Sequence, residues 1–154
     1  MTDPQRLFDC LSYHLEKAPI PDMLAAKENG KWKSYSTREV ADTVNKLSAG
    51  LIQLGISAGD RTVEGMDKVA LISKNCPEWV MVDLAVQQIG AVLTPVYPTI
   101  NVNELEFVLN DAQVKVIFVN DEELFHKVLS IRDKLPSLRE IFTFEHVSHA
   151  RHWK

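Results

Sequence analysis

Cysteine and long apolar runs are both scarce in this sequence. Its 154 residues include two cysteines, Cys10 and Cys76, which are too few for a disulfide framework or a four-ligand zinc site and fit a reducing compartment. The longest apolar runs, 69–72, 79–82 and 116–119, are far shorter than the roughly 18 residues that span a bilayer. The first residues include an acid, Asp3, and lead into no long apolar segment, which argues against a secretory signal. We therefore expect a cytoplasmic protein, and leave open a peripheral place at a membrane surface.

A strong excess of one charge is absent as well. Lysine and arginine number 17 against 21 aspartates and glutamates, a formal net charge of −4, which argues against a nucleic-acid partner. Hydrophobic residues make up 45% and charged residues 25% of the chain, values that exclude a disordered or collagen-like protein. The length is close to that of one domain and allows burial of roughly 70% of the unfolded surface.

The N-terminal third predicts a helix followed by a hairpin. Apolar residues at helical spacing predict an amphipathic helix over about 6–17, and a stripe this short packs on its own domain more often than on a membrane. Two strand-like runs over about 22–35 meet at Glu28-Asn29-Gly30-Lys31, where Asn-Gly favours the tight turn of a hairpin.

A longer helix is expected next. Ser36 and Glu39 have the spacing of a capping box, in which each side chain satisfies an amide at the start of a helix. An apolar stripe from Val40 to Leu54 then predicts one buried helix face, and Gly55 is typical of a helix end.

The rest of the chain alternates between strand and helix. Apolar runs predict strands at 69–73, 92–96, 115–119 and 140–144, and helices at 77–89, 102–111 and 121–135. Strands that are apolar throughout and joined by helices indicate a parallel sheet buried on both faces. The fold class is therefore α/β, doubly wound, with a mainly parallel sheet flanked by helices and an N-terminal helix and β-hairpin. Residues 1–145 form this α/β subdomain, and 146–154 are expected to be an irregular tail or the start of a linker.

The residues that follow the strands are the first place to look for a site, because ligands bind at the carboxyl ends of parallel strands. These are residues 74–79, 97–101 and 120–122, and none contains a glycine-rich phosphate loop. His146, His149 and His152 recur every three residues, but a frayed polar end explains them better than a metal site. Cys76 stands at a helix start without a visible partner base, so we expect no catalytic thiol.

Several segments match motifs of a known enzyme family. Residues 35–40, 47–51 and 54–61 resemble the opening core motif of the adenylate-forming (AMP-binding) superfamily, and 69–79 and 89–99 resemble the approach to its second core motif and that motif itself. The similarity runs from about Phe8 to Phe144. Pro77-Glu78-Trp79, Thr94-Pro95-Val96-Tyr97-Pro98-Thr99 and 104–111 are most similar to the bacterial long-chain fatty acyl-CoA synthetases. The chain departs from the family pattern at 62–66, which looks like an inserted loop, and at Cys76, where relatives often carry arginine.

The resemblance implies an N-terminal piece of an ATP-dependent fatty acid–CoA ligase. Enzymes of this family use ATP, Mg²⁺ and coenzyme A, and their phosphate loop and catalytic residues follow the second core motif. We therefore expect no catalytic or metal-binding residue here, no cofactor bound to this piece alone, and the rest of the synthetase as its partner. The alternatives are a non-catalytic acyl-binding or interaction module and part of an amino-acid or aryl-acid adenylating enzyme.

The resemblance also implies half of a substrate cleft. Trp79, Tyr97, Pro98 and Thr99 follow predicted strands and are candidates to line an acyl channel. Filling of the core near the sheet edge is the competing interpretation for Trp79 and Tyr97. A piece of an enzyme should also expose surface that the remainder covers, which predicts self-association through an apolar patch.

Overall fold

The computed structural model describes residues 3–28 and 30–154, which divide into two compact units. Unit 1 comprises Met1–Gly55 and Cys76–Ile89, and unit 2 comprises Ile56–Asn75 and Gly90–Lys154.

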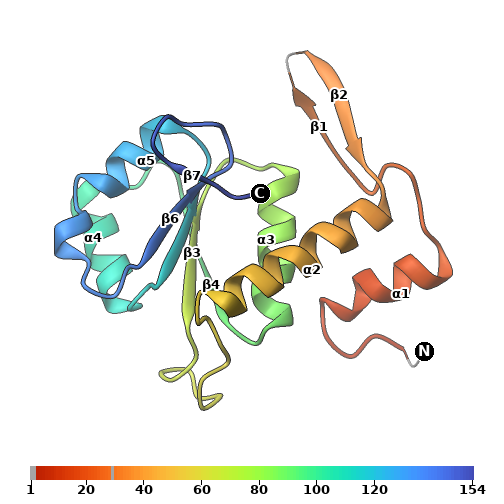
Figure 1. Cartoon of the computed structure of the whole chain (residues 1–154), viewed down its shortest axis with the longest axis horizontal. Helices are drawn as coiled ribbons and strands as arrows, with labels where there is room; N and C mark the ends of the chain where they lie inside the picture. The colour runs from red at the N-terminus through yellow and green to blue at the C-terminus, as the bar shows by residue number, and fades with distance from the viewer. Residues whose placement is uncertain (1–2, 29) are drawn as a thin grey trace. The chain divides into compact units, whose positions relative to one another are not determined.

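Unit 1 is built around two packed helices, α2 (Thr37–Gln53) and α3 (Pro77–Gln88), with α1 (Asp9–Lys17) also packed against α2 (Figure 1). Val40, Val44 and Leu51 form the buried stripe of α2. The Ser48 hydroxyl donates a hydrogen bond of 3.2 Å to the Ala85 carbonyl and so links α2 to α3. The predicted capping box is confirmed, since Ser36 Oγ accepts from the Glu39 amide and Glu39 Oε2 accepts from the Ser36 amide.

The first helix begins three residues later than predicted. The Asp9 carboxylate accepts hydrogen bonds from the backbone amides of Gln5 and Arg6. These bonds hold a turn ahead of the helix, which therefore starts at Asp9 and not at Arg6.

The predicted hairpin is confirmed as β1 (Leu24–Glu28) and β2 (Lys31–Tyr35), paired antiparallel with Lys27 opposite Trp32. Gly30 has the positive φ of 78° that the turn requires. Asn29, the other residue of the predicted turn, lies outside the described residues.

Unit 2 contains a five-stranded sheet in the order β4-β3-β5-β6-β7, in which every pair is parallel. Its elements are β3 (Lys68–Ile72), β4 (Val92–Val96), α4 (Val102–Asp111), β5 (Val116–Val119), α5 (Glu122–Leu129), a 3₁₀ turn η1 (Arg132–Lys134), β6 (Glu140–Thr143) and β7 (Arg151–His152). The predicted α/β class with a parallel sheet and helices beside it is confirmed. The expected loop at 62–66 is confirmed as a run of turns.

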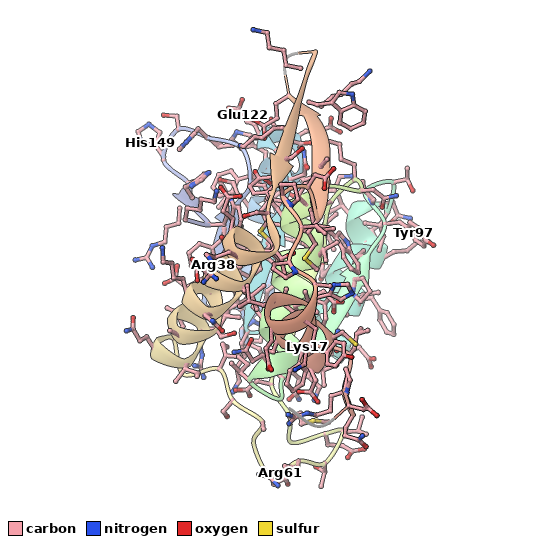
Figure 2. The ribbon with its side chains drawn as sticks, turned by 90° about the vertical axis from the view of Figure 1, so that its right-hand side faces the viewer. Lys17, Arg38, Arg61, Tyr97, Glu122 and His149 are labelled. Atoms are coloured by element: carbon pink, nitrogen blue, oxygen red, sulfur yellow. The ribbon has the colours of Figure 1, made fainter. Side chains whose placement is uncertain are left out.

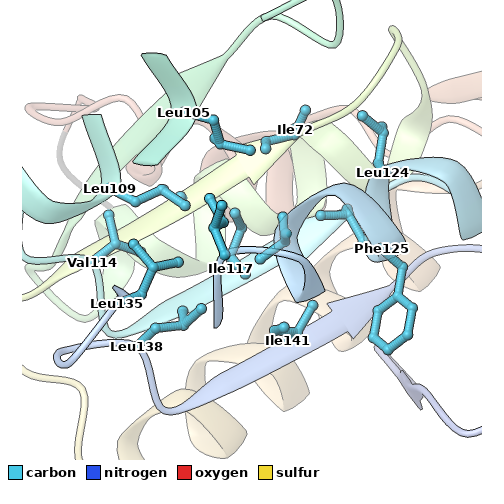
Figure 3. Packing of buried hydrophobic residues seen from close by; sticks show 14 residues of the cluster. Ile72, Leu105, Leu109, Val114, Ile117, Leu124, Phe125, Leu135, Leu138 and Ile141 are labelled. Atoms are coloured by element: carbon cyan, nitrogen blue, oxygen red, sulfur yellow. The ribbon is translucent and has the colours of Figure 1, made fainter. Parts of the chain in front are cut away.

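Helices α4 and α5 pack on one face of this sheet (Figure 1). Figure 3 shows the cluster of buried residues between these helices and the sheet, in which Ile72 and Ile117 of the sheet lie among Leu105, Leu109 and Leu124 of the helices. Burial of this apolar surface stabilises unit 2 and fixes the carboxyl ends of its strands.

The expectation that the strands are buried on both faces is confirmed for β5, which is wholly buried, and for β3, in which only Lys68 is partly exposed. It is wrong for β4, whose residues are partly or fully exposed because β4 is the edge strand. Pro95 fits this position, since an edge strand needs no further amide donors. It is also wrong for β6, where partly exposed and buried residues alternate.

The last predicted helix, 121–135, is too long. Helix α5 ends at Leu129, after which the Ile131 amide donates to the carbonyl of Val128, three residues back, and the Ser130 hydroxyl donates to the Lys127 carbonyl. The tighter spacing and the competing hydroxyl end the α-helix, and the chain continues as η1.

The prediction of an irregular tail at 146–154 is also wrong for its last residues. Arg151 and His152 form β7 beside β6, and the Trp153 amide donates to the Thr143 carbonyl. Trp153 is buried and its ring meets Phe144 edge-on at 5.6 Å. Pairing with β6 and contact with Phe144 order a segment whose own pattern predicts no structure.

Candidate functional site

Polar side chains meet at the carboxyl ends of three neighbouring strands in unit 2. Ser73 follows β3, Asn120 follows β5 and Glu145 comes two residues after β6. Ser73 Oγ donates to Asn120 Oδ1 at 3.1 Å, and Asn120 Nδ2 donates to Glu145 Oε1 at 3.2 Å. The structure thus brings together Ser73 and Asn120, which the sequence places at the ends of separate strands, and Glu145, which the sequence does not single out.

Asn120 is the centre of this network and is 3% exposed. Its side-chain amide also donates to Asp121 Oδ2 at 3.1 Å, its backbone amide donates to the Ile72 carbonyl, and its carbonyl accepts from the Glu145 amide. Lys74 Nζ lies 3.6 Å from Glu145 Oε1. Because the groups bind one another, the network fastens the strand ends together and leaves no unsatisfied buried donor to hold a ligand.

The loop after β4 carries three of the four predicted channel residues. Tyr97 is 85% exposed, Thr99 is exposed and Pro98 is half-buried, and Figure 2 shows Tyr97 at the surface. These residues lie together because they are consecutive in the chain. The fourth, Trp79, is half-buried on α3 in unit 1.

Lys127 holds the loop after β4 in place, although no sequence pattern singles it out. Its ammonium group, on α5, donates to the carbonyl oxygens of Pro98 at 3.1 Å and Ile100 at 3.2 Å. A lysine that acts on backbone carbonyls 29 and 27 residues away leaves no local motif. Only the packing of α5 beside α4 could have indicated it.

An ion pair occupies the opposite end of the strands. Lys115, just before β5, pairs with Asp67, just before β3, and Asp67 Oδ2 also accepts from the Ser57 amide at 2.9 Å. Burial by itself would raise the pKa of Asp67, but the hydrogen bonds from Lys115 and Ser57 outweigh burial and hold that pKa below its usual range.

The histidines of the C-terminal segment do not make a metal centre. His146 and His152 stack with ring centroids 4.1 Å apart, and His152 Nε2 lies 3.0 Å from the Phe144 carbonyl oxygen. Within residues 3–28 and 30–154, no three His, Cys, Asp or Glu side chains are grouped to hold a metal ion. Cys76 occupies the N-cap of α3. None of the described helices is both long enough and apolar enough to cross a membrane.

Comparison with protein families identifies the chain. The family described as AMP-binding enzyme matches residues 15–153. The chain belongs to the AMP-binding enzyme family. Its α/β fold agrees, since the anthranilate CoA ligase AuaEII, solved in complex with anthranoyl-AMP, superposes with a TM-score of 0.76 over 95% of this chain and 25% of its own. At 22% identity this likeness concerns the fold alone.

Curated relatives of this AMP-binding chain are fatty acid ligases. It is 31% identical over 113 residues to the long-chain-fatty-acid–CoA ligase FadD15 of Mycobacterium bovis, a match that covers 73% of this chain and 18% of the relative. It is 32% identical over 127 residues to the long chain acyl-CoA synthetase 5 of Arabidopsis thaliana, covering 78% of this chain and 18% of the relative. The chain therefore spans about a fifth of the length of these relatives.

The described residues do not themselves fit a magnesium–nucleotide site. The carboxylates of Asp121 and Glu145 already accept from the Asn120 amide, and the exposed ammonium of Lys74 lies beside Glu145. None of the segments after the strands carries the glycine-rich loop that would bind phosphate through backbone amides.

Proposed function

We propose that this chain is the N-terminal part of an ATP-dependent long-chain fatty acid–CoA ligase. The observation that carries the proposal is the 31% identity to the FadD15 ligase over 113 residues, joined to the order of the two family motifs along the sequence. In the full-length enzyme a fatty acid and ATP would give an acyl-adenylate and pyrophosphate. Coenzyme A would then displace AMP to give the acyl-CoA thioester, with Mg²⁺ assisting the first step.

Within that enzyme, residues 1–145 act as an α/β subdomain that supplies one half of the substrate cleft. Tyr97, Pro98 and Thr99 stand at the carboxyl end of β4 and offer mixed apolar and polar surface to an acyl chain. Trp79 is the candidate for the same role from unit 1. Since the polar groups at the strand ends are engaged with one another, the 154-residue chain is inactive alone and takes its catalytic groups from the remainder of the synthetase.

Pyrophosphate release in the presence of ATP, Mg²⁺, coenzyme A and palmitate tests this proposal. We expect activity from the longer protein that contains these residues and none from the 154-residue chain under the same conditions. Activity of the short chain would disprove its dependence on further residues. A natural stop codon after Lys154, together with palmitate binding by the short chain, would instead support a non-catalytic acyl-binding module.

Substrate choice needs its own measurement. Profiling of the longer enzyme with fatty, aryl and amino acids should give the highest kcat/KM with long-chain fatty acids. A preference for an aryl or amino acid would be consistent with the proposed adenylate-forming reaction but would contradict the proposed fatty acid substrate.

Self-association is a further part of the proposal. Tyr97 and Phe107 of unit 2 are 85% and 69% exposed, which is unusual for aromatic side chains. Sedimentation velocity over a range of concentrations should show reversible association of the wild-type chain, reduced in a Tyr97→Ser/Phe107→Ser double variant. A strict monomer at high concentration would contradict this expectation.

A further inference from the structure

The β1–β2 hairpin of unit 1 has a firmly held base and an exposed outer part. At the base, Tyr35 is buried and its hydroxyl donates to Glu78 Oε1 at 3.3 Å, which joins β2 to α3. Beyond the base, residues 30–34 are all exposed, and Figure 1 shows the two strands extending away from the start of α2. The outer hairpin is thus presented to solvent on a fixed support.

A tryptophan stands on one face of this hairpin. Trp32 is 70% exposed and lies opposite Lys27 in the strand register, so the two side chains share a face. Lys27 Nζ lies 5.4 Å from the centre of the indole ring. The same face holds the neighbouring pair Ala25 and Ser34, and it carries no carboxylate among the described residues.

The hairpin is positively charged on a chain whose net charge is −4. Its strands hold three lysines against one glutamate. Glu28 is paired with Lys33 at 2.8 Å, and no carboxylate of the described residues forms a salt bridge with Lys27 or Lys31. Two ammonium groups without a carboxylate partner therefore lie on the outer hairpin, Lys27 on the face of the exposed indole and Lys31 on the opposite face.

We propose that the outer β1–β2 hairpin binds membrane surfaces that contain anionic lipids. An indole is stable at the level of the lipid headgroups, where its ring is in apolar surroundings and its N–H is hydrated. Lysines beside it are attracted to the negative headgroups. Strand addition by a protein partner fits less well, because lysines along both strands of a two-stranded sheet oppose pairing at its edges. The inference does not depend on the ligase activity.

Co-sedimentation with vesicles tests the proposal on the 154-residue chain. The probes are vesicles of phosphatidylcholine alone and of phosphatidylcholine mixed in equal parts with phosphatidylglycerol. We expect binding to the mixed vesicles, weakened by salt, and little binding to neutral ones. Trp32→Ala should weaken binding about tenfold, and Lys27→Gln or Lys31→Gln about fivefold each.

Matched control variants distinguish vesicle binding by the hairpin from nonspecific adsorption of the protein. Ile52→Ala removes an apolar side chain that is 59% exposed on α2, and Lys46→Gln removes an exposed lysine on the same helix. Both should bind the mixed vesicles like the wild type. Absence of binding, equal binding to neutral vesicles, or an equal loss in Ile52→Ala and Trp32→Ala would each overturn the proposal. Far-UV circular dichroism checks that every variant keeps its fold.

Discussion

Lys115 and Asp67 form an ion pair that joins the amino ends of two neighbouring parallel strands, β5 and β3. The Asp67 side chain is 8% exposed and that of Lys115 is 29% exposed. Asp67 also accepts from Ser57, so its carboxylate fixes the entry to β3 from two directions. A carboxylate held in this way favours its charged form.

Acid should weaken unit 2 through this pair. Because the folded-state pKa of Asp67 is lowered, its stabilising contribution is present above the unfolded pKa of about 4 and is lost as pH falls through the folded value. Asp67→Asn should therefore lower the free energy of unfolding by about 2 kcal/mol at pH 7 and by much less at pH 2. Urea unfolding at both pH values measures the difference. Asp42→Asn removes an exposed carboxylate on α2. In this variant the free energy of unfolding should change between pH 7 and pH 2 by the same amount as in the wild type.

The side-chain amide of Asn120 should contribute strongly to the stability of unit 2. Asn120→Ala removes the partner of Ser73, Asp121 and Glu145 at three strand ends, and we expect a loss of about 2–3 kcal/mol. Asn103→Ala, on the exposed side of α4, should change stability by less than about 0.5 kcal/mol. Equal unfolding midpoints for the two variants would show that the network adds nothing.

Replacement of two glycines by alanine should change the stability of the protein in opposite directions. Gly90 has φ +75°, and an added Cβ would lie 2.8 Å from the Ala58 Cβ, so Gly90→Ala should destabilise by about 1–3 kcal/mol. Gly50 lies within α2 with nothing near its missing side chain, so Gly50→Ala should stabilise by about 1 kcal/mol. Thermal unfolding of both variants gives the comparison, and a stabilised Gly90→Ala would contradict it.

Local chemistry made much of the fold predictable. The capping box at Ser36 and Glu39 and the apolar run at 116–119 each need only neighbouring residues to act, and both predictions are confirmed. The end of α5 at Leu129 was missed because helical periodicity continues past the point where Ser130 and Ile131 change the hydrogen bonding.

Contacts between distant segments explain what the sequence could not predict. Trp153 becomes ordered through Phe144 and Thr143, nine and ten residues earlier, so its own segment carries no periodic signal. The sequence places Ser73 at the end of one predicted strand and Asn120 just after another, and it does not single out Glu145. Only the strand order β3-β5-β6 brings the three together. Tyr97, Pro98 and Thr99 remain predicted channel residues.

Lys127 should keep the loop that carries Tyr97, Pro98 and Thr99 in a single ordered conformation. Its ammonium donates to the Pro98 and Ile100 carbonyls, and the Ile100 amide closes the turn by donating to the Tyr97 carbonyl. Lys127→Met keeps the apolar stem but removes both donors, at a cost of about 1–2 kcal/mol in local stability.

Hydrogen exchange followed by NMR reports this change at single amides. In Lys127→Met the Ile100 amide should exchange about tenfold faster, since about 1.4 kcal/mol of local stability corresponds to that factor. The Phe118 amide inside β5 should keep its wild-type rate, and Lys46→Met, an exposed lysine on α2, should leave both amides unchanged. If Ile100 keeps its protection in Lys127→Met, the turn is held by its own backbone bond and by the packing of Ile100 against the core cluster, and Lys127 is not a positioning residue.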